Sequence, residues 1–145
     1  MNTVKTTPEG KPPVEAVLTW EGALRFHARS GLANLVLDSD GQAGPSPVQA
    51  LVLALAGCMS VDVVHILERG RQPLRALTSK AHATRAAEEP HRLVAVDLHF
   101  TVSGAIPPDK VERAIALSHD KYCSVWHSMR QDIAFTTTFS VGKVG

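Results

Sequence analysis

The chain has 145 residues, of which 44% are hydrophobic, and its 15 Lys and Arg nearly balance its 14 Asp and Glu. This length favours a single domain, because hydrophobic cores commonly run to about 100–200 residues. The balanced charge removes the electrostatic reason to expect nucleic acid or an anionic membrane surface as a partner.

Neither a membrane span nor a secretory signal is visible. The longest unbroken apolar stretch covers residues 50–59, whereas a membrane-spanning helix needs about 20 apolar residues. The N-terminus has no apolar segment of the kind that directs secretion. We therefore expect a cytoplasmic protein that binds no membrane and no nucleic acid.

The N-terminal part of the chain predicts a tail and then strands. Residues 1–13 hold three prolines and little to bury, so we expect a flexible tail there and one domain over residues 14–145. Arg29, Ser30 and Gly31 are expected at the tip between the second and third strands. The first three strands are expected over residues 14–20, 23–28 and 32–37.

A long helix is expected next, over residues 46–69. Ser46 suits the N-cap, and Pro47 suits the first helical position because proline has a preset φ and no N–H to leave unpaired. Gly70 suits the end of the helix. From Val48 to Asp62 the sequence is apolar nearly all round, and such a helix must be enclosed by protein.

The rest of the chain predicts two strands, two helical segments and a last strand. Residues 93–102 alternate between apolar and mixed positions, which is typical of a strand with one buried face. The strands come in runs rather than in strand–helix–strand units, so the class is α+β with the order βββ-α-ββ-αα-β. The remaining elements are expected over residues 74–87, 93–102, a helix from Pro107, 123–132 and 133–141.

The two cysteines lie in distinctive sequence words. Cys58 closes Leu55-Ala56-Gly57-Cys58, eleven residues after Pro47, and Cys123 lies in Lys121-Tyr122-Cys123-Ser124-Val125. In a reducing compartment such a pair serves either core packing or redox and metal chemistry. With the order of elements above, these words resemble the OsmC/Ohr family, whose names refer to osmotic induction and to organic hydroperoxide resistance.

The resemblance implies a fold, an activity and roles for both cysteines. The expected fold is a long central helix packed on antiparallel sheets, in an intertwined homodimer. The expected activity is thiol-dependent reduction of organic hydroperoxides without a cofactor or metal. Cys58 matches the cysteine that attacks the peroxide and becomes a sulfenic acid, and Cys123 matches the cysteine that resolves it as a disulfide. A dithiol or a lipoyl group would then reduce the pair.

The resemblance also implies an arginine beside the thiolate. Arg29, in Ala28-Arg29-Ser30-Gly31, matches that residue, and Arg25 is the alternative. A guanidinium can hold a thiolate and donate to peroxide oxygens. The family's peroxidases carry a glutamate directly after the helix-opening proline to orient this arginine, whereas this chain has Val48 followed by Gln49.

Other readings of these residues stay open. His119, Cys123 and His127 are spaced to line one helix face, where they could hold zinc, provided that the helix continues through Cys123. Asp62 lies one turn after Cys58, and a carboxylate there opposes thiolate formation unless it turns toward another partner. The alternative function is a binding protein with weak or no catalysis that holds a small hydrophobic or thiol-reactive ligand.

Overall fold

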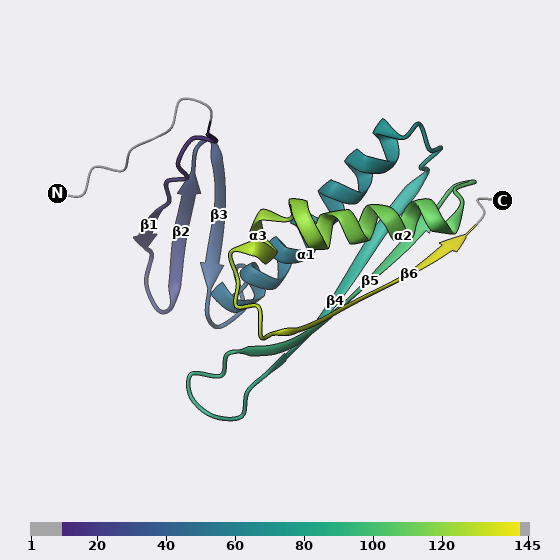
Figure 1. Cartoon of the computed structure of the whole chain (residues 1–145). Helices are drawn as coiled ribbons and strands as arrows, with labels where there is room; N and C mark the ends of the chain where they lie inside the picture. Colours follow the sequence, from purple (N-terminus) through teal and green to yellow (C-terminus); the bar gives the residue numbers. More distant parts are fainter. Residues whose placement is uncertain (1–9, 143–145) are drawn as a thin grey trace. The chain divides into compact units, whose positions relative to one another are not determined.

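A computed structural model of the chain describes residues 10–142 (Figure 1). The fold divides into two compact units, one up to Ala50 and one from Leu51 onward. Most of the predicted tail lies outside the described residues. Its described part, residues 10–13, is exposed and contains no helix or strand.

The first unit contains an antiparallel sheet in the order β1-β2-β3. Its strands are β1 (Val17–Trp20), β2 (Arg25–Ser30) and β3 (Ala33–Asp38). Arg29 lies inside β2, opposite Val17 and Asn34, rather than at the tip where we expected it. The reason is a tight two-residue connection between Ser30 and Ala33, which begins with Gly31 at a φ of 57°. Such a short turn leaves Arg29 within the strand ladder.

The long helix is confirmed as α1 (Pro47–Arg69), and its start is held by a capping box. The Gln49 backbone N–H donates to Ser46 Oγ over 3.2 Å, and the Ser46 N–H donates to Gln49 Oε1 over 2.9 Å. The helix ends directly before Gly70, as expected. One stripe of the helix is buried, at Leu55, Met59, Val63 and Leu67.

The second unit contains a mixed sheet in the order β4-β5-β6. Its strands are β4 (Ala76–Arg85), β5 (Leu93–Ser103) and β6 (Ala134–Gly142). β4 and β5 are antiparallel, but β5 and β6 are parallel, so the expectation of purely antiparallel sheets was wrong for this pair. The chain crosses from β5 to β6 through helices that return it to the starting end of β5, and such a crossover makes the two strands parallel.

This crossover contains α2 (Pro108–Leu117), a π-helical turn η1 (Ser118–Tyr122) and α3 (Ser124–His127). The helical segment expected over residues 123–132 is therefore much shorter. Cys123 adopts an extended conformation with a ψ of 100°, and this residue interrupts the helical path between η1 and α3.

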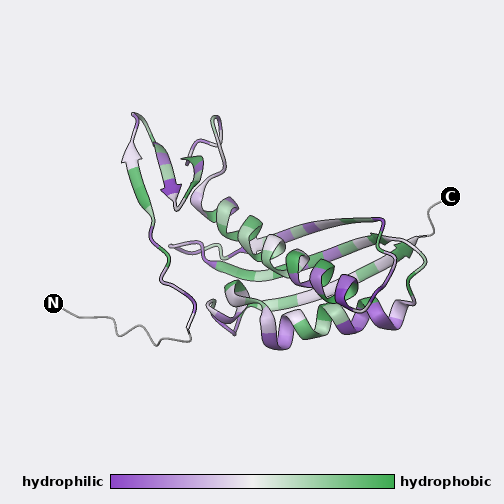
Figure 2. Ribbon diagram, turned by 90° about the horizontal axis from the view of Figure 1, so that it is seen from above, coloured by the Kyte–Doolittle hydropathy of each residue, from purple (hydrophilic) through white to green (hydrophobic). Residues whose placement is uncertain are grey.

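In the second unit, α1 and α2 cover the same face of the sheet (Figure 2). Ser60 of α1 shares a hydrogen bond of 2.8 Å with Ser79 of β4, and α2 packs against β6. The predicted alternation of β5 is confirmed at its buried positions, which point toward these helices: Val96, Leu98, Phe100 and Val102.

The outer side of α1 is apolar and poorly covered within one chain. By length and hydropathy this helix could cross a membrane, a test that the core helix of a soluble fold also passes. Only 22% of its most apolar stretch is buried, and Leu53 and Val61 are 63% and 68% exposed. A helix with this composition needs further protein around it.

Candidate active site

Cys58 lies near the middle of α1 and is half-buried. The two residues beside it in the sequence differ in burial: Gly57 is exposed and Met59 is completely buried. The thiol is therefore at the border of the core, where a small molecule can approach it. No disulfide is present, and both cysteines are free thiols.

Cys123 is completely buried at the N-cap of α3. Its backbone N–H donates to the Ser118 carbonyl over 2.8 Å and closes the π-helical turn. Its sulfur accepts a hydrogen bond from the Trp126 backbone N–H at 3.3 Å. π-Helical turns are frequent at functional sites, and this one delivers a cysteine to the interior of the second unit.

The two thiols, 65 residues apart in the sequence, act on each other in the folded chain. Burial is the largest of the effects that together raise the pKa of the Cys123 thiol to about 11; the Trp126 backbone N–H opposes it, and interactions with Cys58 add to it. The fold thus brings together the two cysteines that the sequence singled out.

Asp62 accepts a hydrogen bond from a buried hydroxyl. The Ser118 hydroxyl donates to Asp62 Oδ2 over 2.7 Å, and Met59 Sδ lies 3.3 Å from the same hydroxyl oxygen. The sequence singled out Asp62 but gave no reason to expect Ser118 as its partner, because the two are 56 residues apart and a lone serine carries no motif.

The two candidate arginines differ in their surroundings. Arg25 Nε lies 3.7 Å from Asp38 Oδ2, and Asp38 is buried. Arg29 is exposed and forms no ion pair with the residues that the structure describes. Both arginines belong to the first unit and both cysteines to the second. Of the two, Arg29 has the guanidinium that is available to another partner.

Val48 and Gln49 follow the helix-opening proline, and neither is an acid. The Gln49 side chain is committed to the capping box, because its Oε1 accepts the Ser46 N–H. The first turn of α1 contains no acidic residue. The first turn of α1 therefore supplies no carboxylate of its own.

The histidines near Cys123 are engaged in local contacts. His119 Nδ1 lies 2.8 Å from Asp120 Oδ1, and His127 Nε2 lies 3.1 Å from the His119 carbonyl. The helical alignment that a zinc site required is lost at Cys123, because the chain is extended there. Within residues 10–142, no three His, Cys, Asp or Glu side chains gather closely enough to hold a metal ion.

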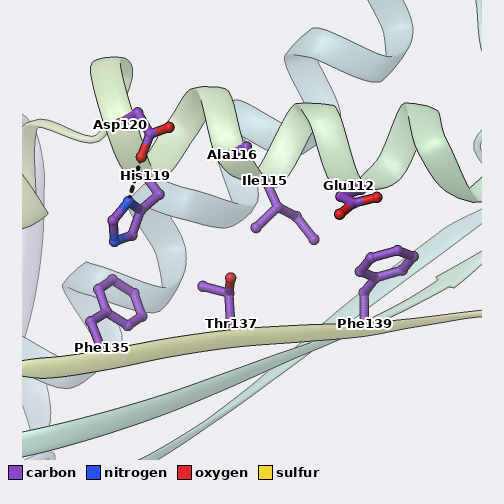
Figure 3. Close-up of a pocket in the computed structure, with 8 residues that line it drawn as sticks. All are labelled: Glu112, Ile115, Ala116, His119, Asp120, Phe135, Thr137 and Phe139. Carbon is purple, nitrogen blue, oxygen red and sulfur yellow. Dashed lines mark hydrogen bonds and ion pairs between the residues drawn. The ribbon is translucent and has the colours of Figure 1, made fainter.

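A cavity of about 380 Å³ lies between the α2–η1 segment and β6 (Figure 3). Its floor consists of the alternate β6 side chains Phe135, Thr137 and Phe139. Ile115 closes its apolar roof, and neither cysteine lines it. The polar groups of the lining are Glu112, His119, Asp120 and Thr137.

The comparisons with known proteins agree with this architecture. The sequence model of the OsmC-like protein family matches residues 39–138. Protein YhfA of Escherichia coli K12 is 34% identical over 132 residues, which cover 88% of this chain and 98% of that protein.

Solved structures share the fold at lower identity. A hypothetical protein from Aquifex aeolicus superposes with a TM-score of 0.86 at 21% identity, over 93% of this chain and all of that one. An organic hydroperoxide resistance protein OsmC from Legionella pneumophila superposes with a TM-score of 0.69 at 19% identity, over 92% of this chain and all of that one. In this soluble fold α1 is the core helix. The chain belongs to the OsmC-like family.

Proposed function

We propose that the protein is a thiol-dependent peroxidase that reduces organic hydroperoxides. The observation that carries this proposal is the pairing of a half-buried Cys58 with a completely buried Cys123 that interacts with it. Two free thiols in this arrangement can pass reversibly between a dithiol and a disulfide. Some solved relatives in fold are named organic hydroperoxide resistance proteins, which supports the same choice of substrate.

The first step assigns the attacking role to Cys58. Its thiolate attacks the peroxide oxygen that is not bonded to carbon, the O–O bond breaks, and the alkoxide leaves and takes a proton as an alcohol. Cys58 is thereby oxidised to the sulfenic acid. Cys123 is unsuited to this role, because it is completely buried and because its pKa is raised to about 11, chiefly by burial.

The second step assigns the resolving role to Cys123. Its sulfur, as thiolate, attacks the Cys58 sulfur, the S–O bond breaks, and hydroxide leaves and takes a proton as water. The product is a Cys58–Cys123 disulfide. An external dithiol or a lipoyl group then reduces this disulfide to two thiols and is itself oxidised. No bound cofactor takes part in the proposed cycle.

Arg29 is our choice for the cation that stabilises the Cys58 thiolate. Arg25 lies near the buried Asp38, while Arg29 is exposed and has no ion-pair partner among residues 10–142. A guanidinium can donate to a thiolate and to a peroxide oxygen together. Val48 stands where the family's peroxidases have a glutamate, so we expect turnover to be slower than theirs.

We further propose a homodimer in which a second copy of the chain covers α1. Among residues 10–142 each sheet has three strands, and its edge strands can pair with strands of a second copy. Leu53 and Val61 expose apolar surface on the core helix of a soluble fold. A second copy would supply strands to pair with the sheet edges and protein surface to cover the apolar side of α1. Light scattering at micromolar concentration tests this proposal, and a monomeric mass would contradict it.

The proposed peroxidase is tested by peroxide consumption in the presence of a dithiol. We expect turnover by the wild type, and loss of turnover in both Cys58→Ser and Cys123→Ser. The second variant should accumulate sulfinic or sulfonic acid at Cys58, because nothing captures the sulfenic acid. Equal rates in all three proteins would contradict the proposal. A cytoplasmic location, which we also propose, would keep both cysteines reduced between cycles.

A second candidate function is the binding of a small ligand with little or no catalysis. The cavity under α2 favours it, because about 380 Å³ lies at the lower end of the range of ligand sites. Phe135 and Phe139 would contact an apolar body, while Glu112 and Asp120 would attract a basic group.

Calorimetric titration with 2-phenylethylamine tests this alternative, with 2-phenylethanol as the uncharged counterpart. The alternative predicts saturable binding of the amine that weakens in Glu112→Gln and persists in Glu88→Gln, a change outside the cavity lining. Equal binding of both compounds, or no binding of either, would contradict it.

A further inference from the structure

Ser118 uses all of its polar groups to join three segments of the second unit. Its backbone N–H donates to the carbonyls of Ala114 and Ile115 at the end of α2. Its carbonyl accepts the Cys123 N–H over 2.8 Å, and its hydroxyl donates to Asp62 over 2.7 Å. The residue is completely buried, so its own polar atoms are shielded from water.

The partner of this hydroxyl lies on the helix of the other cysteine. Asp62 follows Cys58 by one turn of α1, so the two side chains occupy neighbouring positions on one helix face. A hydrogen bond to a carboxylate is stronger than one between neutral groups. The contact between Ser118 and Asp62 therefore ties the turn that presents Cys123 to the part of α1 that carries Cys58.

We propose that Ser118 and Asp62 form a positioning pair that holds Cys123 against Cys58 for disulfide formation. This proposal rests on the proposed function, in which that disulfide resolves the Cys58 sulfenic acid. Neither residue touches the reacting atoms. Their hydrogen bond lowers the entropy cost of bringing the two sulfurs together, because the Cys123 turn is already fixed to α1.

The same pair bears on the charge beside Cys58. A free carboxylate one helical turn from a thiol opposes ionisation of that thiol, because the two negative charges repel each other. The Ser118 hydroxyl holds Asp62 in a partly buried hydrogen bond, so the carboxylate is directed toward the Cys123 turn. Asp62→Asn separates the hydrogen bond to Ser118 from the charge beside Cys58, since an asparagine side chain can still accept a hydrogen bond from the hydroxyl but carries no charge.

The test compares the stability of the Cys58–Cys123 disulfide in glutathione redox buffers across four proteins. These are the wild type, Ser118→Ala, Asp62→Asn and Ser128→Ala. Ser128 is a matched control, because its exposed hydroxyl bonds only to the Ser124 carbonyl within the same segment.

We expect Ser118→Ala to lower the disulfide equilibrium constant about tenfold, which is about 30 mV for a two-electron couple. Asp62→Asn should lower the constant less than Ser118→Ala, because it retains a neutral acceptor, and Ser128→Ala should stay at the wild-type value, because it leaves the pair intact. A purely structural role would lower the melting temperature without this shift in potential. Circular dichroism confirms that each variant is folded before the redox titration. Should Ser118→Ala fail to fold, Asp62→Ala removes the same hydrogen bond from the other side.

A Ser118→Ala potential equal to that of the wild type would overturn the proposal. The peroxide reaction gives a separate result, because dimedone traps the Cys58 sulfenic acid before the resolving step. If Cys123→Ser, in which nothing competes with dimedone, yields no sulfenic acid with cumene hydroperoxide while the shift in potential is present, the proposed peroxidase function fails and the positioning pair stands. If the sulfenic acid forms and the potential does not shift, the positioning pair fails and the proposed peroxidase function stands.

Discussion

The Trp126 backbone N–H donates a hydrogen bond to the Cys123 sulfur over 3.3 Å. The second cysteine is thus the N-cap of α3 as well as the candidate resolving thiol. A disulfide with Cys58 would engage the same sulfur, so the state of the thiol and the start of this helix are linked.

Replacement of Cys123 should affect stability through the cap. We expect Cys123→Ala to lower the free energy of unfolding by about 1 kcal/mol relative to Cys123→Ser, because serine still accepts the Trp126 N–H. Cys58 is the matched control: it lies inside α1, where alanine is the better helix former, so the order of the two variants should reverse. Urea unfolding measures both pairs. The same order at both positions would contradict the capping role.

The two thiols should differ in reactivity. In the reduced protein at neutral pH, iodoacetamide should label Cys58 well before Cys123, because Cys123 is buried and its pKa is raised to about 11. Labelling of Cys123 should accelerate as the pH rises toward that value, since the thiolate is the reactive form. Peptide mass spectrometry after timed quenching measures both rates. Equal labelling at neutral pH would contradict the assigned order of attack.

Asp38 should make the first unit sensitive to acid. Backbone N–H groups of Ala43 and Asp40 donate to its buried carboxylate, and these bonds, with Arg25 nearby, hold its pKa below the ordinary value of 3.8. A lowered folded-state pKa stabilises the fold above the unfolded pKa, and this contribution is lost as the pH falls through the folded pKa.

Asp38→Asn should therefore flatten the fall in unfolding free energy between about pH 5 and pH 2. The control is Asp40→Asn, which changes the exposed neighbouring carboxylate. Urea unfolding across this range measures the three slopes. Parallel slopes for wild type and Asp38→Asn would show that the Asp38 carboxylate has no such role.

Val48→Glu should raise both stability and peroxidase activity. The first turn of α1 has no acid, and a carboxylate there interacts favourably with the helix dipole by about 0.3–1 kcal/mol. The family's peroxidases use a glutamate at this position to orient the arginine, so the variant should also reduce cumene hydroperoxide faster. Val48→Gln is the uncharged control. A gain in melting temperature without a gain in rate would count against the role of Arg29.

The sequence predicted most of the fold, because its strongest signals are local. The proline-led start of α1, its Gly70 stop and the alternation of β5 are set by residues that are close in the chain. The parallel pairing of β6 was missed, since strand direction depends on how the crossover packs and not on the composition of the strand. Arg29 was predicted at the tip between two strands but lies within β2, because the tight β2–β3 turn begins only at Gly31.

The candidate site was predictable where a sequence word carried it. Cys58 and Cys123 stood in such words, and the fold brings their thiols into interaction. Ser118 was missed because a buried serine gains its role from one long-range hydrogen bond, which leaves no local pattern. A separate helical segment was expected from Cys123, and its start is close to that of α3, but the segment ends at His127 rather than at residue 132.

The most direct test of the redox account is the intact mass of the protein under non-reducing conditions after one equivalent of cumene hydroperoxide. The account predicts a loss of two hydrogens and a peptide that links Cys58 to Cys123. An unchanged mass, or an added oxygen that stays on Cys58 with Cys123 still free, would contradict it.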